Sequence, residues 1–110
     1  MAEFVTSNNL NAKLEEIFES ATKKLLIISP FIKLHPRYKS ALKSALRYPK
    51  LEIHIVFGKN ENKITSSLSQ EDFEFFREFP NLHIYYEPNL HAKFYANEDT
   101  ALLSSMNLYD

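Results

Sequence analysis

Apolar and polar residues follow two different periods along this chain, and the changes of period divide it into helices and strands. Helical spacing begins after Ser7, Asn8 and Asn9, which are residue types that cap helix starts. The uncharged apolar run over residues 25–32 predicts a buried strand that ends near Pro30. The apolar face of the first predicted helix consists of Leu10, Leu14, Ile17, Phe18 and Ala21.

The rest of the chain continues this alternation. Ser69 to Asp72 resembles a capping box, so the helical segment around it can be two helices. Residues 97–100, at the junction of the last two strands, are typical of a hairpin turn. The predicted elements are, in order, a helix over 36–47, a strand over 51–58, a helical segment over 64–79 and strands over 82–88, 90–96 and 100–105.

This order of elements predicts the fold class. Strands that alternate with helices favour an α/β fold with a mixed, mostly parallel sheet flanked by helices. We expect five strands, with the closing hairpin antiparallel. No internal repeat, low-complexity tract or linker is present, so residues 1–110 are predicted to be a single domain, either complete or a fragment of a longer chain.

Composition excludes several functional classes. The chain has 110 residues and 45% apolar residues, enough for one small domain with a packed core. The absence of cysteine excludes disulfides, thiolate zinc sites and a cysteine nucleophile, and is consistent with a cytoplasmic location. The single glycine excludes a glycine-rich phosphate loop. No apolar stretch is long enough to span a membrane, and the polar start is not typical of a signal peptide. The four histidines are not at ligand spacing in the sequence, so no metal site and no cofactor are expected.

Charge is distributed unevenly, although the net charge is only −1. Residues 33–50 contain six basic residues and no acidic residue. Such a block suggests a phosphate-bearing partner, and it is compatible with nucleic acid, with DNA as the expected partner, and equally with lipid headgroups. Three of these residues, Lys39, Lys43 and Arg47, recur every fourth position and are predicted to lie along one helix face. Ordinary solvated surface is the default interpretation of that stripe, and contact with a nucleic-acid backbone is the alternative.

A set of residues suited to phosphate chemistry lies near the end of the chain. His91 and Lys93 are two apart in a predicted strand, so both should point to the same face. The predicted hairpin would return Ser105 and Asn107 beside them. The lysine would offset charge on phosphate oxygens, the hydroxyl and the amide would donate hydrogen bonds, and the imidazole could attack or shuttle a proton.

These residues resemble the phospholipase D superfamily signature, which is His-x-Lys, four residues, Asp, and then Gly-Ser-x-Asn after a short gap. His91-Ala92-Lys93 matches the first part, Glu98 stands at the Asp position, and Ser104-Ser105-Met106-Asn107 matches the last part except at its first residue. The segment "IISPFI" also resembles the first strand of bacterial, nuclease-like members. The motif covers 17 residues, and the helix–strand order extends the likeness over most of the chain.

The resemblance implies a metal-independent phosphodiesterase. His91 would attack phosphorus to give a phosphohistidine, while Lys93, Ser105 and Asn107 hold the phosphate and Glu98 orients the site, with Asp99 as the alternative carboxylate. The family takes a second histidine from a second motif, which would protonate the leaving oxygen and activate water. This chain has one motif, so a homodimer is expected to complete the active site.

Other interpretations stay open from the sequence. The same fold could be a catalytically silent domain that binds nucleic acid or a protein, or an enzyme that cleaves phospholipids. DNA, RNA and lipid substrates are not distinguished. His35 could contact substrate, whereas His54 and His83 are interpreted as core or surface residues. Four phenylalanines are interpreted as core or as a dimer seam: Phe73, Phe75, Phe76 and Phe79.

Overall fold

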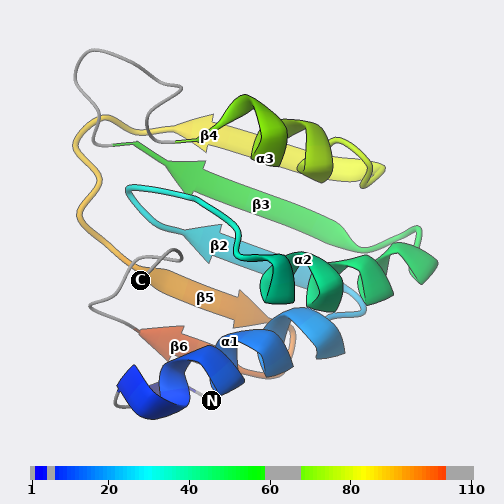
Figure 1. Cartoon of the computed structure of the whole chain (residues 1–110), viewed down its shortest axis with the longest axis horizontal. Coiled ribbons are helices and arrows are strands. Elements are labelled where there is room, and N and C mark those ends of the chain that lie inside the picture. The colour runs from blue at the N-terminus through cyan, green and yellow to red at the C-terminus, as the bar shows by residue number, and fades with distance from the viewer. Residues whose placement is uncertain (1, 5–6, 59–67, 104–110) are drawn as a thin grey trace.

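Strands form one mixed sheet, and the helices pack against one of its faces (Figure 1). The computed structural model describes residues 2–4, 7–58 and 68–103. Its strands are β1 (Ala2–Phe4), β2 (Lys24–Ile28), β3 (Glu52–Phe57), β4 (Asn81–Tyr86), β5 (Phe94–Asn97) and β6 (Ala101–Leu103). Its helices are α1 (Ser7–Ser20), α2 (Pro36–Lys43), the 3-10 helix η1 (Ser44–Arg47) and α3 (Gln70–Phe76).

The order of strands across the sheet is β1-β6-β5-β2-β3-β4. Strands β2, β3 and β4 are parallel neighbours, and α2 and α3 lie in the connections between them. Strand β5 is antiparallel to both β2 and β6, and β1 pairs in parallel with β6. The predicted α/β class and the antiparallel closing hairpin are therefore confirmed, and the sheet is mixed.

One face of the sheet carries the core. Leu25 pairs with Ile53 and Ile27 with Ile55 between β2 and β3, and all four side chains are fully buried. Because side chains on a strand alternate between faces, these residues share one face with Tyr95 of β5, which pairs with Ile27. Helix α1 covers this face with the buried apolar residues Leu10, Leu14, Ile17 and Phe18. The predicted core of the first helix is confirmed.

The opposite face of the sheet is more open. The described helices that flank the sheet, α1, α2 and α3, all lie on one side of it (Figure 1). Side chains of the other face are only partly buried or exposed, for example Leu26 and Val56, and Leu103 is 50% exposed. The described helices cover the face with the fully buried residues, and none of them covers the half-buried alternate positions of the strands (Figure 1).

Capping residues explain where two helices begin. The side chain of His35 accepts a hydrogen bond from the backbone N–H of Arg37, and Pro36 occupies the first turn of α2. The predicted helix over 36–47 becomes an α-helix to Lys43 followed by η1. Ser69 accepts a hydrogen bond from the N–H of Asp72 at the start of α3, as the capping pattern predicts. The predicted start of that helical segment, at residue 64, lies outside the described residues.

Strand β5 is shorter than predicted, so His91 and Lys93 lie outside it. The prediction placed His91 and Lys93 inside a strand over 90–96, but β5 begins at Phe94, which pairs with Ile28 of β2. Strand β2 ends there because Pro30, two residues on, has no N–H with which to extend the ladder. His91 and Lys93 therefore lie in the segment that enters β5.

Gly58, the single glycine of the chain, is required by a close approach of two backbones. A Cβ atom at this position would lie 1.9 Å from the carbonyl oxygen of Glu87. The backbone N–H of Glu87 also donates to the carbonyl of Phe57 at 2.8 Å. Glycine therefore lets the chain that leaves β4 pack directly on the end of β3, on its way to His91.

The predicted phenylalanine cluster belongs to the core. Phe75, Phe76 and Phe79 are buried, and Phe73 packs against the same core while partly exposed. Among the helices that the structure describes, none combines the length and the apolar character needed to cross a bilayer.

Candidate functional site

Two loops that are far apart in the sequence leave the sheet at the same end. His91 and Lys93 lie just before β5, and β5 runs antiparallel to β2. The loop that leaves β2 and carries Lys33 and His35 starts at the same end, because Ile28 and Phe94 are paired. Both loops therefore extend from the edge at which parallel strands β2 and β3 end. We call Lys33, His35, His91 and Lys93 the basic edge.

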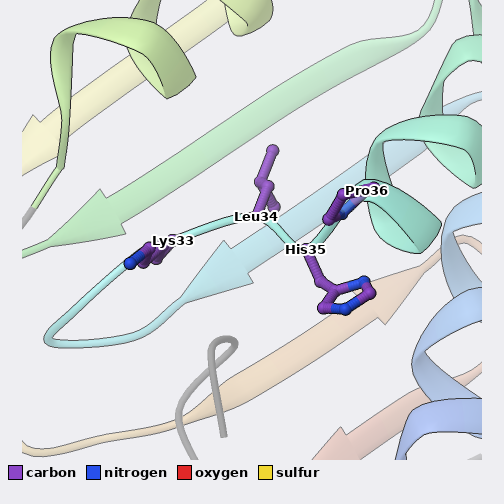
Figure 2. Close-up of a pocket in the computed structure, with 4 residues that line it drawn as sticks. All are labelled: Lys33, Leu34, His35 and Pro36. Atoms are coloured by element: carbon purple, nitrogen blue, oxygen red, sulfur yellow. The ribbon is translucent and has the colours of Figure 1, made fainter.

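The loop between β2 and α2 lines a surface pocket with Lys33, Leu34, His35 and Pro36 (Figure 2). Leu34 and His35 point in opposite directions from this loop (Figure 2). Leu34 is buried, whereas Lys33 and His35 are exposed. The Nδ1 atom of His35 accepts the N–H of Arg37 at 3.2 Å, which fixes the orientation of the ring at the start of α2.

His91 is exposed and Lys93 is half-buried, so both can be reached from solvent. The partners predicted for them, Ser105 and Asn107, lie outside the described residues. The register of the hairpin is nevertheless informative, because Leu103 of β6 pairs with Phe94, the residue that follows Lys93. The described part of β6 thus ends beside the start of β5. The chain after Leu103 therefore leaves β6 toward the His91–Lys93 segment, as the predicted hairpin requires.

Glu98 occupies a different place from the one predicted. It follows Asn97, which pairs with Leu25 near the beginning of β2, whereas Lys93 precedes Phe94 at the other end of β5. Five residues of extended chain span about 16 Å. The predicted role of Glu98 in orienting His91 is therefore corrected. The alternative carboxylate, Asp99, is exposed in the same turn, where its backbone N–H donates to Asn97 at 2.8 Å.

The carboxylate of Glu98 holds the backbone that enters β2. Its oxygens accept the backbone N–H groups of Thr22, Lys23 and Lys24 at 3.1 Å each, together with the hydroxyl of Thr22 at 3.0 Å. Partial desolvation opposes ionisation and raises the pKa of Glu98. The hydrogen bonds from the backbone of Lys24 and Lys23 and from Thr22 outweigh it, and they lower the pKa from 4.5 to about 2. Glu98 therefore stabilises the α1–β2 connection.

We expect Glu98→Gln to destabilise the fold in a pH-dependent way. Because the folded-state pKa is depressed, the carboxylate contributes stability that is present above about pH 4.5 and is lost as the pH falls toward about 2. Allowing for its partial exposure, the loss at pH 7 should be about 2 kcal/mol. Urea denaturation between pH 3 and 7 measures it. The exposed Glu78→Gln is the matched control, and equal losses for both variants at pH 7 would contradict this role.

Lys39, for which the sequence left ordinary solvated surface and nucleic-acid contact as alternatives, is engaged in ion pairs. Its ammonium lies 3.1 Å from Asp72 Oδ1 and 3.2 Å from Glu71 Oε1. Asp72 is 3% exposed, and its other oxygen accepts the backbone N–H of Leu34 at 3.0 Å. Burial lowers the pKa of Lys39, but the hydrogen bonds and charges of Asp72 and Glu71 outweigh burial and raise it overall. Lys39 thus ties α2 to α3.

The other two residues of the stripe, Lys43 and Arg47, are exposed. Lys43 ends α2, whereas Arg47 ends η1, where its guanidinium lies 5.1 Å from the centre of the Tyr48 ring. Arg47 also lines a surface depression together with Glu15, Glu16 and Glu19 of α1. Acidic side chains therefore surround this end of the stripe, which weakens its attraction for a polyanion. Nucleic-acid contacts by Lys43 and Arg47 stay predictions.

Two histidines that the sequence separates by 29 positions are brought together by the sheet. His54 of β3 pairs with His83 of β4, and their rings stack with centres 4.5 Å apart. Glu52 lies beside them, with Oε1 3.3 Å from His54 Nε2. The expectation that no histidines cluster at ligand spacing is therefore wrong. The sequence did contain a signal for this cluster. Each of the two predicted strands carries one histidine among apolar residues, and parallel pairing can place these two histidines side by side.

Comparison with known proteins gives a likeness of fold. No family model and no curated protein matches the sequence. Among solved structures, the fold is similar to that of TrmBL2, an archaeal chromatin protein described as showing a novel mode of DNA binding. The TM-score is 0.58 at 12% sequence identity, over 83% of this chain and 33% of that chain. This chain thus spans about a third of the length of its neighbour, and the phospholipase D resemblance stays a prediction.

Proposed function

We propose that this domain binds nucleic acid through its phosphates at the basic edge. The observation that carries the proposal is that the loops containing residues 33–35 and 91–93 both leave the sheet at the end where Ile28 pairs with Phe94. Two lysines and two histidines there offer N–H donors and positive charge to a polyanion, which is how most protein–nucleic acid contacts are made. Exposed loops at the ends of parallel strands are also common binding positions in α/β folds.

The likeness of fold to TrmBL2 also supports the proposal of nucleic-acid binding. TrmBL2 is a DNA-binding protein by its description, and the shared fold covers most of this chain. DNA is accordingly the first ligand to test. Because the charge of the chain is nearly balanced overall, binding should depend on the local basic edge rather than on net charge.

We expect the double variant Lys33→Ala/Lys93→Ala to weaken binding to duplex DNA and to flatten its salt dependence. Each lost phosphate contact reduces the slope of log K against log salt by about 0.9, so two contacts reduce it by about two units. Fluorescence anisotropy with a labelled duplex between 50 and 200 mM salt measures the slope.

The matched control is Lys24→Ala/Lys50→Ala, which removes two exposed lysines at the opposite end of the sheet. It changes the net charge by the same amount and should leave the slope close to that of the wild type. If both double variants flatten the slope equally, the protein attracts DNA through its general charge and the basic edge is not the binding site.

A second candidate function, phosphodiester hydrolysis, is favoured by the position of the His91-x-Lys93 motif at the entry to β5, opposite the end of β6. In this hypothesis His91 attacks phosphorus, a P–N bond forms, and the P–O bond to the leaving group breaks. The leaving oxygen takes a proton from the His91 of a second copy. That second imidazole then removes a proton from water, which attacks the phosphohistidine and frees His91.

A further inference from the structure

We propose that Glu52, His54 and His83 form a binding site for a divalent transition-metal ion, with Zn²⁺ as the best-suited ion. The three residues lie on the open face of the sheet, away from the helices, and belong to β3 and β4. This site is independent of the proposed nucleic-acid binding, because the basic edge lies in the loops beyond the strand ends.

Strand geometry places the three side chains together. Glu52 and His54 are two residues apart in β3, so they point to the same face. His54 and His83 are direct partners in the parallel ladder between β3 and β4, so His83 points to that face as well. The backbone ladder therefore positions all three ligands, and rotamer changes alone can adjust them.

The distances approach those of a metal site. With bonds of about 2.0–2.1 Å to nitrogen and oxygen, tetrahedral zinc ligands lie about 3.3–3.4 Å from one another. His54 Nε2 and Glu52 Oε1 are already 3.3 Å apart. One ligating atom from each of the three residues lies within 4.8 Å of the others. The two imidazole rings are stacked with their planes inclined by 9°, so side-chain rotations must tilt them toward each other for one nitrogen of each to bind the same ion.

The type of ligand selects the type of metal. Imidazole nitrogen suits Zn²⁺, Cu²⁺, Ni²⁺ and Fe²⁺, whereas Mg²⁺ and Ca²⁺ prefer sets made of oxygen. Two histidines and one glutamate form a three-ligand zinc set that keeps a fourth position open. His54 and Glu52 are only partly buried, with side chains 31% and 47% exposed, so that position would face solvent. Water or an outside ligand could complete the coordination.

The test is a Zn²⁺ titration of the full chain without a histidine tag, followed by competition with a chromophoric chelator. The wild type should bind one equivalent. Loss of even an outer-shell partner costs about 10–100-fold in metal affinity, so His54→Gln and His83→Gln should each cost at least about 100-fold. Glu52→Gln, which keeps the shape of the side chain, should also weaken binding, and it serves as the second variant if a histidine variant does not fold.

The matched control is His35→Asn, which removes an exposed histidine outside the cluster and keeps a residue that caps α2. It should bind Zn²⁺ as the wild type does. NMR spectra recorded during the titration should show the first changes at His54 and His83. The proposal is overturned if the wild type binds no Zn²⁺, if the three cluster variants retain its affinity, or if His35→Asn loses as much as they do.

Discussion

Replacing His91 with Ala should abolish the proposed phosphodiester cleavage while leaving the fold intact. The side chain is exposed and lies in a loop, so its loss leaves no cavity in the core. In the proposed reaction His91 forms the covalent bond to phosphorus, and loss of a nucleophile costs an enzyme about 10³-fold or more in turnover. Turnover of bis-(4-nitrophenyl) phosphate in the presence of EDTA measures the effect, because no metal takes part in the proposed steps.

A mixing experiment tests whether two chains share one site. The proposed double-displacement route needs two histidines, and this chain supplies one motif, so the route requires a dimer with the two copies of His91 near its axis. When wild type and His91→Ala exchange subunits freely, activity should fall as the square of the wild-type fraction. Size-exclusion chromatography checks that mixed dimers form.

Three outcomes would contradict this scheme. A linear fall in activity would show that each chain carries a complete site. Loss of turnover in EDTA, restored by Mg²⁺ or Mn²⁺, would remove the metal-independent mechanism. Wild type that binds DNA without cleaving any diester would leave the binding function and exclude the hydrolytic one.

Lys39→Met should lower the free energy of unfolding by about 2–3 kcal/mol. Removing one partner of a buried ion pair costs about 3–5 kcal/mol, and screening reduces that cost here because the side chain of Lys39 is 21% exposed. The substitution leaves the carboxylate of Asp72 buried without its cation. Methionine keeps an unbranched side chain of similar length but removes the ammonium, which lies 5.7 Å from the centre of the Phe75 ring. Urea denaturation at pH 7 measures the change.

The matched control for this prediction is Lys43→Met, one helical turn further along α2 at an exposed position. It should change stability by less than about 0.5 kcal/mol. A double-mutant cycle with Asp72→Asn should show strong coupling to Lys39 and little coupling to Lys43. Equal losses for the two lysine variants would mean that Lys39 is ordinary surface, as the stripe alone had suggested.

The hydrophobic pattern was sufficient to predict most elements of this fold. Residues 10–21 alternate at helical spacing, and residues 25–32 form an apolar run, and these local signals correspond to α1 and β2. The pattern works because burial of a helix stripe or a strand face is the main term that stabilises each element. Strand β1 was missed, since three residues carry too short a pattern to be recognised.

The end of β5 and the function of Glu98 depended on tertiary structure. The sequence places Lys93 and Glu98 five residues apart in one motif, whereas pairing with β2 puts them at opposite ends of a strand. Nothing local indicates that the N–H groups of residues 22–24 would reach Glu98, because those partners are more than 70 positions away. The sequence motif thus drew attention to His91 and Lys93, but it did not indicate that Glu98 binds the backbone of residues 22–24.

Charge and metal ligands show the same division. The sequence by itself determined that residues 33–50 are basic and that the chain has four histidines. Only the packing of α2 against α3 decided that Lys39 faces a buried aspartate, and only the register of β3 with β4 decided that His54 stacks on His83. The charge of a segment and the residue types in it can be read directly from the sequence. Contacts between distant segments depend on strand register and helix packing, which the whole buried core selects at once.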